Sequence, residues 1–192
     1  MMSTQAKWDA IYSSANVAEV NPIELLTEHP FLLPKTGNAL DLACGLGANA
    51  LWLAGQGLNV DAWDISQIAL QKLQHQTQNR PLSINTRQCD IQAEILPKQY
   101  YDVIVLSRFL DRSLCRAIMD ALKPAGLLFY QTFIRNKLDS HNGPNNPDYL
   151  LNTNELLQLF SGLNVVYYQE YARIGELSHG NRNEAGLIAQ KA

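Results

Sequence analysis

The chain has 192 residues, of which 46% are apolar and 17% charged, and this composition indicates one globular domain over residues 1–192 and not a disordered chain. The formal net charge is −3, so no broad basic field is available for a nucleic acid. The start of the chain carries no apolar signal segment and no long apolar run follows, which predicts a cytoplasmic protein that does not bind a membrane.

The N-terminal part of the chain has the pattern of helices. Residues Thr4–Tyr12 predict a helix on which Trp8 and Tyr12, four residues apart, share one face. Pro22 is suited to the first turn of a second helix, because its nitrogen needs no hydrogen-bond partner there.

The stretch ALDLACGLGANA is the most informative part of the chain. It is an apolar strand that ends at Asp41, followed by a turn with Gly45 and Gly47 and then by a helical pattern. Together with Ala50 and Asp64, these glycines also satisfy the spacing of a nicotinamide dinucleotide site. The carboxylate of Asp41 would repel a pyrophosphate at the helix N-terminus, whereas it suits an ammonium group. Asp41 therefore favours S-adenosylmethionine as the cofactor.

The rest of the chain alternates strands with helices and ends in two strands that no helix separates. The predicted strands are Asn59–Asp64, Ser83–Cys89, Tyr101–Leu106, Leu127–Phe133, Val165–Tyr171 and Ala185–Ala189, and the predicted helix caps are Ser66, Ser113 and Asn152 or Thr153. The alternation predicts a parallel sheet with right-handed crossovers, and the final pair predicts one antiparallel strand.

The cysteines form no C-x-x-C pair, and each lies in or beside an apolar run. This pattern indicates buried free thiols and a reducing compartment. The residues concerned are Cys44, Cys89 and Cys115.

Several motifs in this order resemble those of the class I S-adenosylmethionine-dependent methyltransferases, and the tellurite-resistance-type and small-molecule enzymes among them most. DLACGLGANA resembles the first motif, VDAWDIS the second strand, RQCDIQ the end of the third, YDVIVLSRFL the fourth, and LKPAGLLFYQTF the LKPGG turn and fifth strand. Ala43 and Ala125 stand where that family commonly has glycine. The resemblance implies an α/β fold with a Rossmann-like seven-stranded, mostly parallel sheet, one antiparallel strand near the C-terminus, helices on both faces and an N-terminal helical lid.

The resemblance also implies which residues hold the cofactor. Asp64 is expected to accept hydrogen bonds from the ribose hydroxyls, and its alternative role is that of a turn or capping residue before Ser66. Asp90 is expected to meet the adenine amino group and Ile91 to contact the ring. The full set of expected cofactor-binding residues is Asp41, Ala43, Gly45, Gly47, Asp64, Ile65, Asp90, Ile91 and Leu106.

The residues that act on the methyl acceptor are less clear from the sequence. Candidates at the carboxyl ends of the fourth and fifth strands are Tyr12, Arg108, His141, His179 and Arg182. Arg108 either binds an acidic acceptor or pairs with Asp111. Trp8 and Tyr12 form either a lid over the cofactor or a hydrophobic staple onto the core. GEL followed by histidine and arginine resembles the tail of the tellurite-resistance-type enzymes, although Ser178 shifts the histidine by one position.

The sequence therefore predicts an enzyme that transfers a methyl group from S-adenosylmethionine to a small-molecule thiol, oxyanion or hydroxyl. The basic candidates at that edge favour an anionic acceptor. The histidines lack metal-ligand spacing, so no metal is expected. The expected partner is a small molecule, with no nucleic acid or membrane, and the expected state is a monomer or weak homodimer. The alternatives are a cofactor-binding module without turnover and a nicotinamide-dependent oxidoreductase.

Overall fold

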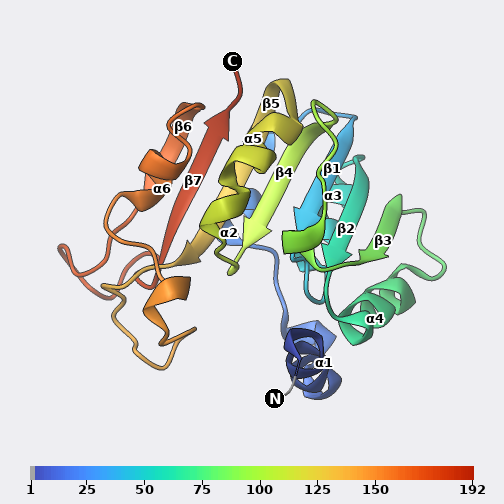
Figure 1. The fold of residues 1–192 in the computed structure, drawn as a ribbon, viewed down its shortest axis with the longest axis horizontal. Helices are drawn as coiled ribbons and strands as arrows, with labels where there is room; N and C mark the ends of the chain where they lie inside the picture. Colours follow the sequence, from blue (N-terminus) through green and yellow to red (C-terminus); the bar gives the residue numbers. More distant parts are fainter. Residues whose placement is uncertain (1–2) are drawn as a thin grey trace.

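The computed structural model describes residues 3–192; Met1 and Met2, which begin the segment assessed above for a targeting signal, lie outside it. A single sheet organises the chain, with the strand order β3-β2-β1-β4-β5-β7-β6 (Figure 1). Its strands are β1 (Asn38–Leu42), β2 (Asn59–Asp64), β3 (Ile84–Gln88), β4 (Tyr101–Ser107), β5 (Leu122–Phe133), β6 (Asn164–Gln169) and β7 (Glu184–Gln190).

The first five strands run parallel, and β7 is antiparallel to both of its neighbours, β5 and β6. Strands β2 and β4 lie on opposite sides of β1, so the strand order reverses beside β1. Ligands of open α/β sheets bind at such a reversal, beyond the carboxyl ends of the strands. The predicted seven-stranded sheet with one antiparallel strand is confirmed.

Helices cover both faces of this sheet, as predicted. They are α1 (Thr4–Ser14), α2 (Glu24–Thr27), α3 (Ala48–Gly55), α4 (Gln67–Thr77), α5 (Cys115–Ala121) and α6 (Glu155–Leu159). Leu26, Leu53 and Leu70 of α2, α3 and α4 belong to one buried apolar cluster. Ile118 of α5 and Leu156 of α6 belong to a second cluster on the opposite face. Alternating strand residues fill the two clusters, because successive side chains point to opposite faces of a sheet.

Helix α1 lies apart from these layers, beyond the carboxyl ends of β1 and β2 and beside α4 (Figure 1). None of its residues is buried. Asp9 accepts a hydrogen bond of 2.6 Å from the hydroxyl of Ser66, the N-cap of α4. Lys72 of α4 donates to the carbonyl oxygens of Tyr12 (2.6 Å) and Ala15 (2.8 Å) at the C-terminal end of α1. Side chains of α4 thus fix α1 in the position expected of a lid.

Two of the predicted helix caps are wrong. The side chain of Asp111, and not that of Ser113, accepts the capping bond, at 2.9 Å from the Ser113 nitrogen. This bond begins a short 3₁₀ turn, so that α5 starts later than expected. Asn154, and not either of the two residues before it, precedes α6, with φ +60° and no side-chain capping bond. The Glu155 side chain accepts from the Asn152 nitrogen at 2.7 Å instead.

All cysteines of the chain are buried and free, which confirms the prediction for the thiols. Burial raises the pKa of both Cys89 and Cys115 to about 11, so these thiols stay protonated at neutral pH. Within residues 3–192, no helix has the length and apolar character needed to cross a membrane.

Replacing Ala125 with glycine is expected to stabilise the fold. Ala125 is exposed and has φ +63°, a left-handed conformation that costs an L-residue about 1–2 kcal/mol. Allowing for the greater backbone entropy of glycine, the free energy of unfolding should rise by about 0.5–1 kcal/mol, or about 1–4 °C in Tm. Ala117→Gly, inside α5, should lower the free energy of unfolding by about 1 kcal/mol. Thermal unfolding of both variants measures this, and a lower Tm for Ala125→Gly would contradict the strain.

Candidate active site

The carboxylate of Asp41 is fully buried at the end of β1 (0% exposed). Its Oδ2 accepts from the backbone nitrogen of Ala50 at 3.0 Å, at the start of α3. Its Oδ1 has no hydrogen-bond partner among the described residues. Burial raises the pKa of Asp41 to about 7. Because a buried acceptor without a partner is costly, Oδ1 marks a position for a donor that the chain does not supply.

Asp64 ends β2 and holds the glycine turn. One of its oxygens accepts from the Gly45 nitrogen and the other from the Ser66 nitrogen, each at 2.8 Å. Asp64 therefore does have the role of a turn residue considered above. A carboxylate oxygen has two lone pairs, so each retains capacity for a ribose hydroxyl. Burial raises the pKa of Asp64 as well.

The turn after β1 lies directly against Tyr12 of α1. Gly45 and Gly47 have φ +53° and +78°, and Ala43 has φ +57°. A Cβ added at Gly45 would lie 2.7 Å from the Tyr12 hydroxyl oxygen. Burial, with a further contribution from the Asp64 carboxylate, raises the pKa of Tyr12 above its usual value, so that its phenol is protonated at neutral pH. The Tyr12 ring stacks on Trp8 at 5.7 Å between ring centroids, on the shared face predicted from their spacing.

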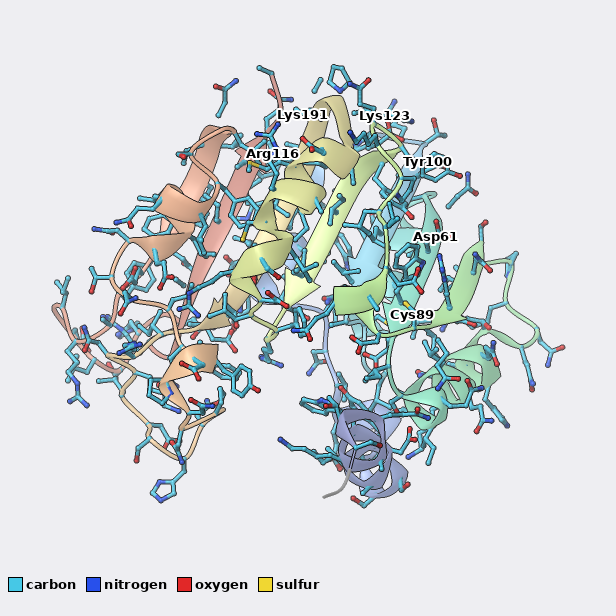
Figure 2. All side chains as sticks on the ribbon, viewed as in Figure 1. Asp61, Cys89, Tyr100, Arg116, Lys123 and Lys191 are labelled. Carbon is cyan, nitrogen blue, oxygen red and sulfur yellow. The ribbon has the colours of Figure 1, made fainter. Side chains whose placement is uncertain are left out.

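A cavity of about 350 Å³ lies at the carboxyl ends of β2 and β3, between the body of the protein and the start of α1. Figure 2 shows Cys89 at this edge of the sheet, with Lys123 and Lys191 at the opposite edge. The cavity is lined by Ser3, Thr4, Gln5, Ile65, Gln88, Cys89 and Asp90. It lies where the resemblance predicts the adenine of the cofactor.

Asp90, expected at the adenine, lines this cavity, as does Ile65 of the expected cofactor-binding set, whereas Ile91, expected at the ring, is not among its lining residues. The side chain of Asp90 also accepts from the Gln92 nitrogen at 3.2 Å and caps a short 3₁₀ turn. Ile91 and Leu106 are 6% and 1% exposed and belong to a hydrophobic cluster. Contact of these residues with a cofactor stays a prediction.

Arg108 follows β4, with φ +54°, but it does not pair with Asp111. Its Nε donates to Oε1 of Glu184 at 2.7 Å. Asp111 instead accepts from Gln92 at 2.5 Å and from the Ser113 hydroxyl at 2.6 Å.

The other candidates for the acceptor site bond within their own loops. His141 and His179 have side chains that are 95% and 77% exposed, and each lies near an acidic side chain of its own loop, Asp139 or Glu176. Arg182 donates to backbone carbonyl oxygens of its loop, among them that of Ile174 at 2.6 Å. The structure therefore gives Arg182 a role in shaping the loop between β6 and β7.

The sequence analysis missed Glu184 and Gln131. Glu184 is 3% exposed and Gln131 is 1% exposed, and each directly adjoins the buried apolar run of its strand, β7 or β5. Glu184 Oε2 accepts from Gln131 Nε2 at 2.5 Å and from Asn181 Nδ2 at 3.0 Å. Gln131 Oε1 has no partner in the described part of the chain. A polar residue beside each apolar run was the available signal.

Comparisons with known proteins point to one family. Residues 27–188 match the family model described as "Tellurite resistance protein TehB". A probable S-adenosyl-L-methionine-dependent methyltransferase TehB of Haemophilus influenzae is 31% identical over 86 residues, which cover 44% of this chain and 30% of that protein. A ubiquinone biosynthesis O-methyltransferase of Coxiella burnetii is 26% identical over 122 residues, 61% of this chain. The match spans about half, 52%, of that relative's length.

Solved structures share the fold. The crystal structure of TehB from Haemophilus influenzae superposes with a TM-score of 0.73 at 23% identity, covering 96% of this chain and 67% of that one. An S-adenosylmethionine-dependent methyltransferase from Mesorhizobium loti gives a TM-score of 0.68 at 18% identity, covering 92% of this chain and 100% of the other. The family model covers most of the chain, and the fold agrees with that of the solved structures. This chain therefore belongs to the TehB family of class I S-adenosylmethionine-dependent methyltransferases.

Proposed function

We propose that this chain transfers the methyl group of S-adenosylmethionine to a hydroxyl oxygen of a small molecule. The observation that carries the cofactor assignment is the unpartnered Oδ1 of Asp41, which is buried beside the glycine turn. An ammonium group donates hydrogen bonds and carries the charge that a buried carboxylate needs. A dinucleotide would instead bring pyrophosphate charge to the same place.

The residues of the site fit the parts of that cofactor. Asp41 would take the ammonium group, the Gly45 turn would border the methionine chain, and Asp64 would accept from the ribose hydroxyls. The cavity with Ile65 and Asp90 would take the adenine. When bound, the cofactor supplies a methyl group activated by a sulfonium charge, and the acceptor oxygen gains this methyl group as its proton leaves to solvent. The protein's contribution is positioning, which is worth about 7–11 kcal/mol for well-oriented reactants.

A hydroxyl acceptor fits the site better than the anionic acceptor that the sequence favoured. The charge of Arg108 is compensated by the buried Glu184 at 2.7 Å. Arg182 is bonded to carbonyl oxygens, and both candidate histidines are exposed on loops. Some relatives are named as O-methyltransferases, which supports oxygen as the methylated atom. We propose further that the enzyme is cytoplasmic, acts as a monomer or weak homodimer, and does not act on nucleic acid.

S-adenosylhomocysteine, the demethylated product, should raise the Tm of the protein, because a ligand that binds only the folded state stabilises it. The gain at a hundredfold excess over Kd is about 2.7 kcal/mol. NAD should give no shift, because its pyrophosphate meets Asp41. A thermal-shift titration with each ligand measures this. Stabilisation by NAD and not by S-adenosylhomocysteine would refute the proposed function.

A further inference from the structure

Beside the predicted cofactor site, one polar cluster at the carboxyl edge of the sheet is not explained by the fold. It consists of Arg108 after β4, Gln131 on β5, and Asn181 and Glu184 at the start of β7, and we call it the Glu184 cluster. Glu184 accepts hydrogen bonds from all three of the other side chains. Three donors leave this carboxylate well satisfied, so Glu184 positions its neighbours and is a poor general base.

Gln131 carries the second observation, an unpartnered acceptor. Its side-chain oxygen Oε1 is buried and has no partner within residues 3–192, although its nitrogen donates to Glu184 at 2.5 Å. The orientation of this amide is fixed by Glu184, because the reverse orientation would set two oxygens against each other. Gln131 Oε1 is therefore a buried acceptor for which the described part of the chain supplies no donor.

Arg108 supplies the complementary donors. Only its Nε is bonded to Glu184, and its two Nη groups have no partner in the described residues. Its side chain is 54% exposed, so these groups are accessible. Its backbone holds a left-handed φ of +54° while its nitrogen donates to the Gln131 carbonyl oxygen at 2.8 Å. The backbone thus fixes Arg108 next to Gln131.

A hydrogen-bonded link connects this cluster with the turn after β1. Asn49 of α3 donates to the Ser107 hydroxyl at 3.0 Å, and Ser107 is paired in register with Gln131 in the sheet. Asn49 directly precedes Ala50, whose nitrogen donates to Asp41. The cluster therefore lies on the same edge as the predicted methionine site, on the side toward β5 and β7.

We infer that the Glu184 cluster is the subsite that recognises the methyl acceptor, and that it selects an uncharged hydroxyl group. The hydroxyl proton is donated to Gln131 Oε1, and the hydroxyl oxygen accepts from an Nη group of Arg108. Because Glu184 balances the charge of Arg108, and because Gln131 presents an oxygen, a bare oxyanion is disfavoured there. This inference rests on the proposed function and adds the residues and the charge state of the acceptor.

The test measures binding of small probes to the complex of the protein with S-adenosylhomocysteine, by ligand-observed NMR titration. Phenol presents an O–H group, anisole is the same molecule with that proton replaced by a methyl group, and selenite is an anion. Phenol should bind at least about tenfold more tightly than anisole or selenite, because a site built to hydrogen-bond a hydroxyl rejects analogues that lack it.

Variants assign the effect to the cluster. Gln131→Met and Arg108→Met should each weaken phenol binding about tenfold and leave the affinity for S-adenosylhomocysteine unchanged. Glu184→Gln should shift the preference from phenol toward selenite about tenfold, because it exposes the charge of Arg108. Gln190→Met makes the same chemical change at the opposite end of β7 and should leave phenol binding unchanged.

The outcomes separate this inference from the proposed function. If the wild-type protein does not bind S-adenosylhomocysteine, both are overturned. If it binds S-adenosylhomocysteine but not phenol, or binds selenite more tightly than phenol, only the hydroxyl subsite is overturned. Equal phenol affinity in the wild type and Gln131→Met, each folded and binding S-adenosylhomocysteine, also overturns it.

Discussion

Gly45→Val is expected to abolish binding of S-adenosylhomocysteine, with a loss of affinity of at least about a hundredfold. A Cβ at this position would lie 2.7 Å from the Tyr12 hydroxyl oxygen, in the space that the turn shares with α1. The backbone φ of +53° adds strain, because β-branched residues rarely adopt this conformation. Isothermal titration calorimetry on the folded variant measures the loss.

Gly55→Ala is the matched control for this substitution. A Cβ at Gly55 meets nothing within 4 Å, and the residue ends α3 on the side away from the turn. Its affinity for S-adenosylhomocysteine should equal that of the wild type. Normal binding by Gly45→Val, with cooperative unfolding preserved, would show that this turn does not hold the cofactor.

Asp41 should make cofactor binding depend on pH near neutrality. Its pKa is raised by burial to about 7, so the ionised form that pairs with an ammonium group is lost as the pH falls below 7. Affinity for S-adenosylhomocysteine should fall by up to about tenfold per pH unit between pH 7 and pH 5. Asp41→Asn should bind weakly at every pH and keep only the shallower dependence that Asp64 contributes. Identical pH profiles for the two proteins would exclude this role for Asp41.

Asp41→Asn should also stabilise the ligand-free protein at high pH. A carboxyl group whose pKa is higher in the folded than in the unfolded state contributes stability below about pH 4, and this is lost as the pH rises through 7. Asp41→Asn should therefore raise the free energy of unfolding by about 2–4 kcal/mol at pH 8, and by little at pH 4. Asp61→Asn serves as the control, since that residue lies on β2 away from the turn.

Much of this fold could be predicted because its signals are local. Strand β2 has the predicted bounds, since its alternating pattern ends at an acid and a helix cap follows. Asp41 and the glycine turn lie in one short strand–turn–helix unit. Strand β2, which ends at Asp64, is the parallel neighbour of β1, so Asp64 comes to lie beside this turn.

The Glu184 cluster could not be predicted in the same way. Glu184 and Gln131 meet only because β7 pairs antiparallel with β5 in one register, with Phe133 opposite Glu184 and Gln131 opposite Gly186. A shift of β7 by one residue would turn Glu184 to the other face of the sheet, away from Gln131. The partner of Arg108 lies 76 residues away for the same reason. The cap before α5 was mispredicted for a different reason: Asp111 and Ser113 are both residue types that cap helices well, and they lie two residues apart, so composition alone does not distinguish them.

The attachment of α1 has a consequence for turnover. Its hydrogen bonds to other elements run to α4 and the N-cap of α4, through Asp9 and Lys72, and it buries no residue of its own. Detaching it breaks a few part-buried hydrogen bonds and leaves both apolar clusters intact, so it belongs to the part of the molecule that opens most easily. Under the proposed function, we expect product release to need a swing of this helix, so that substitutions in α1 alter the residence time of the product without loss in the stability of the sheet.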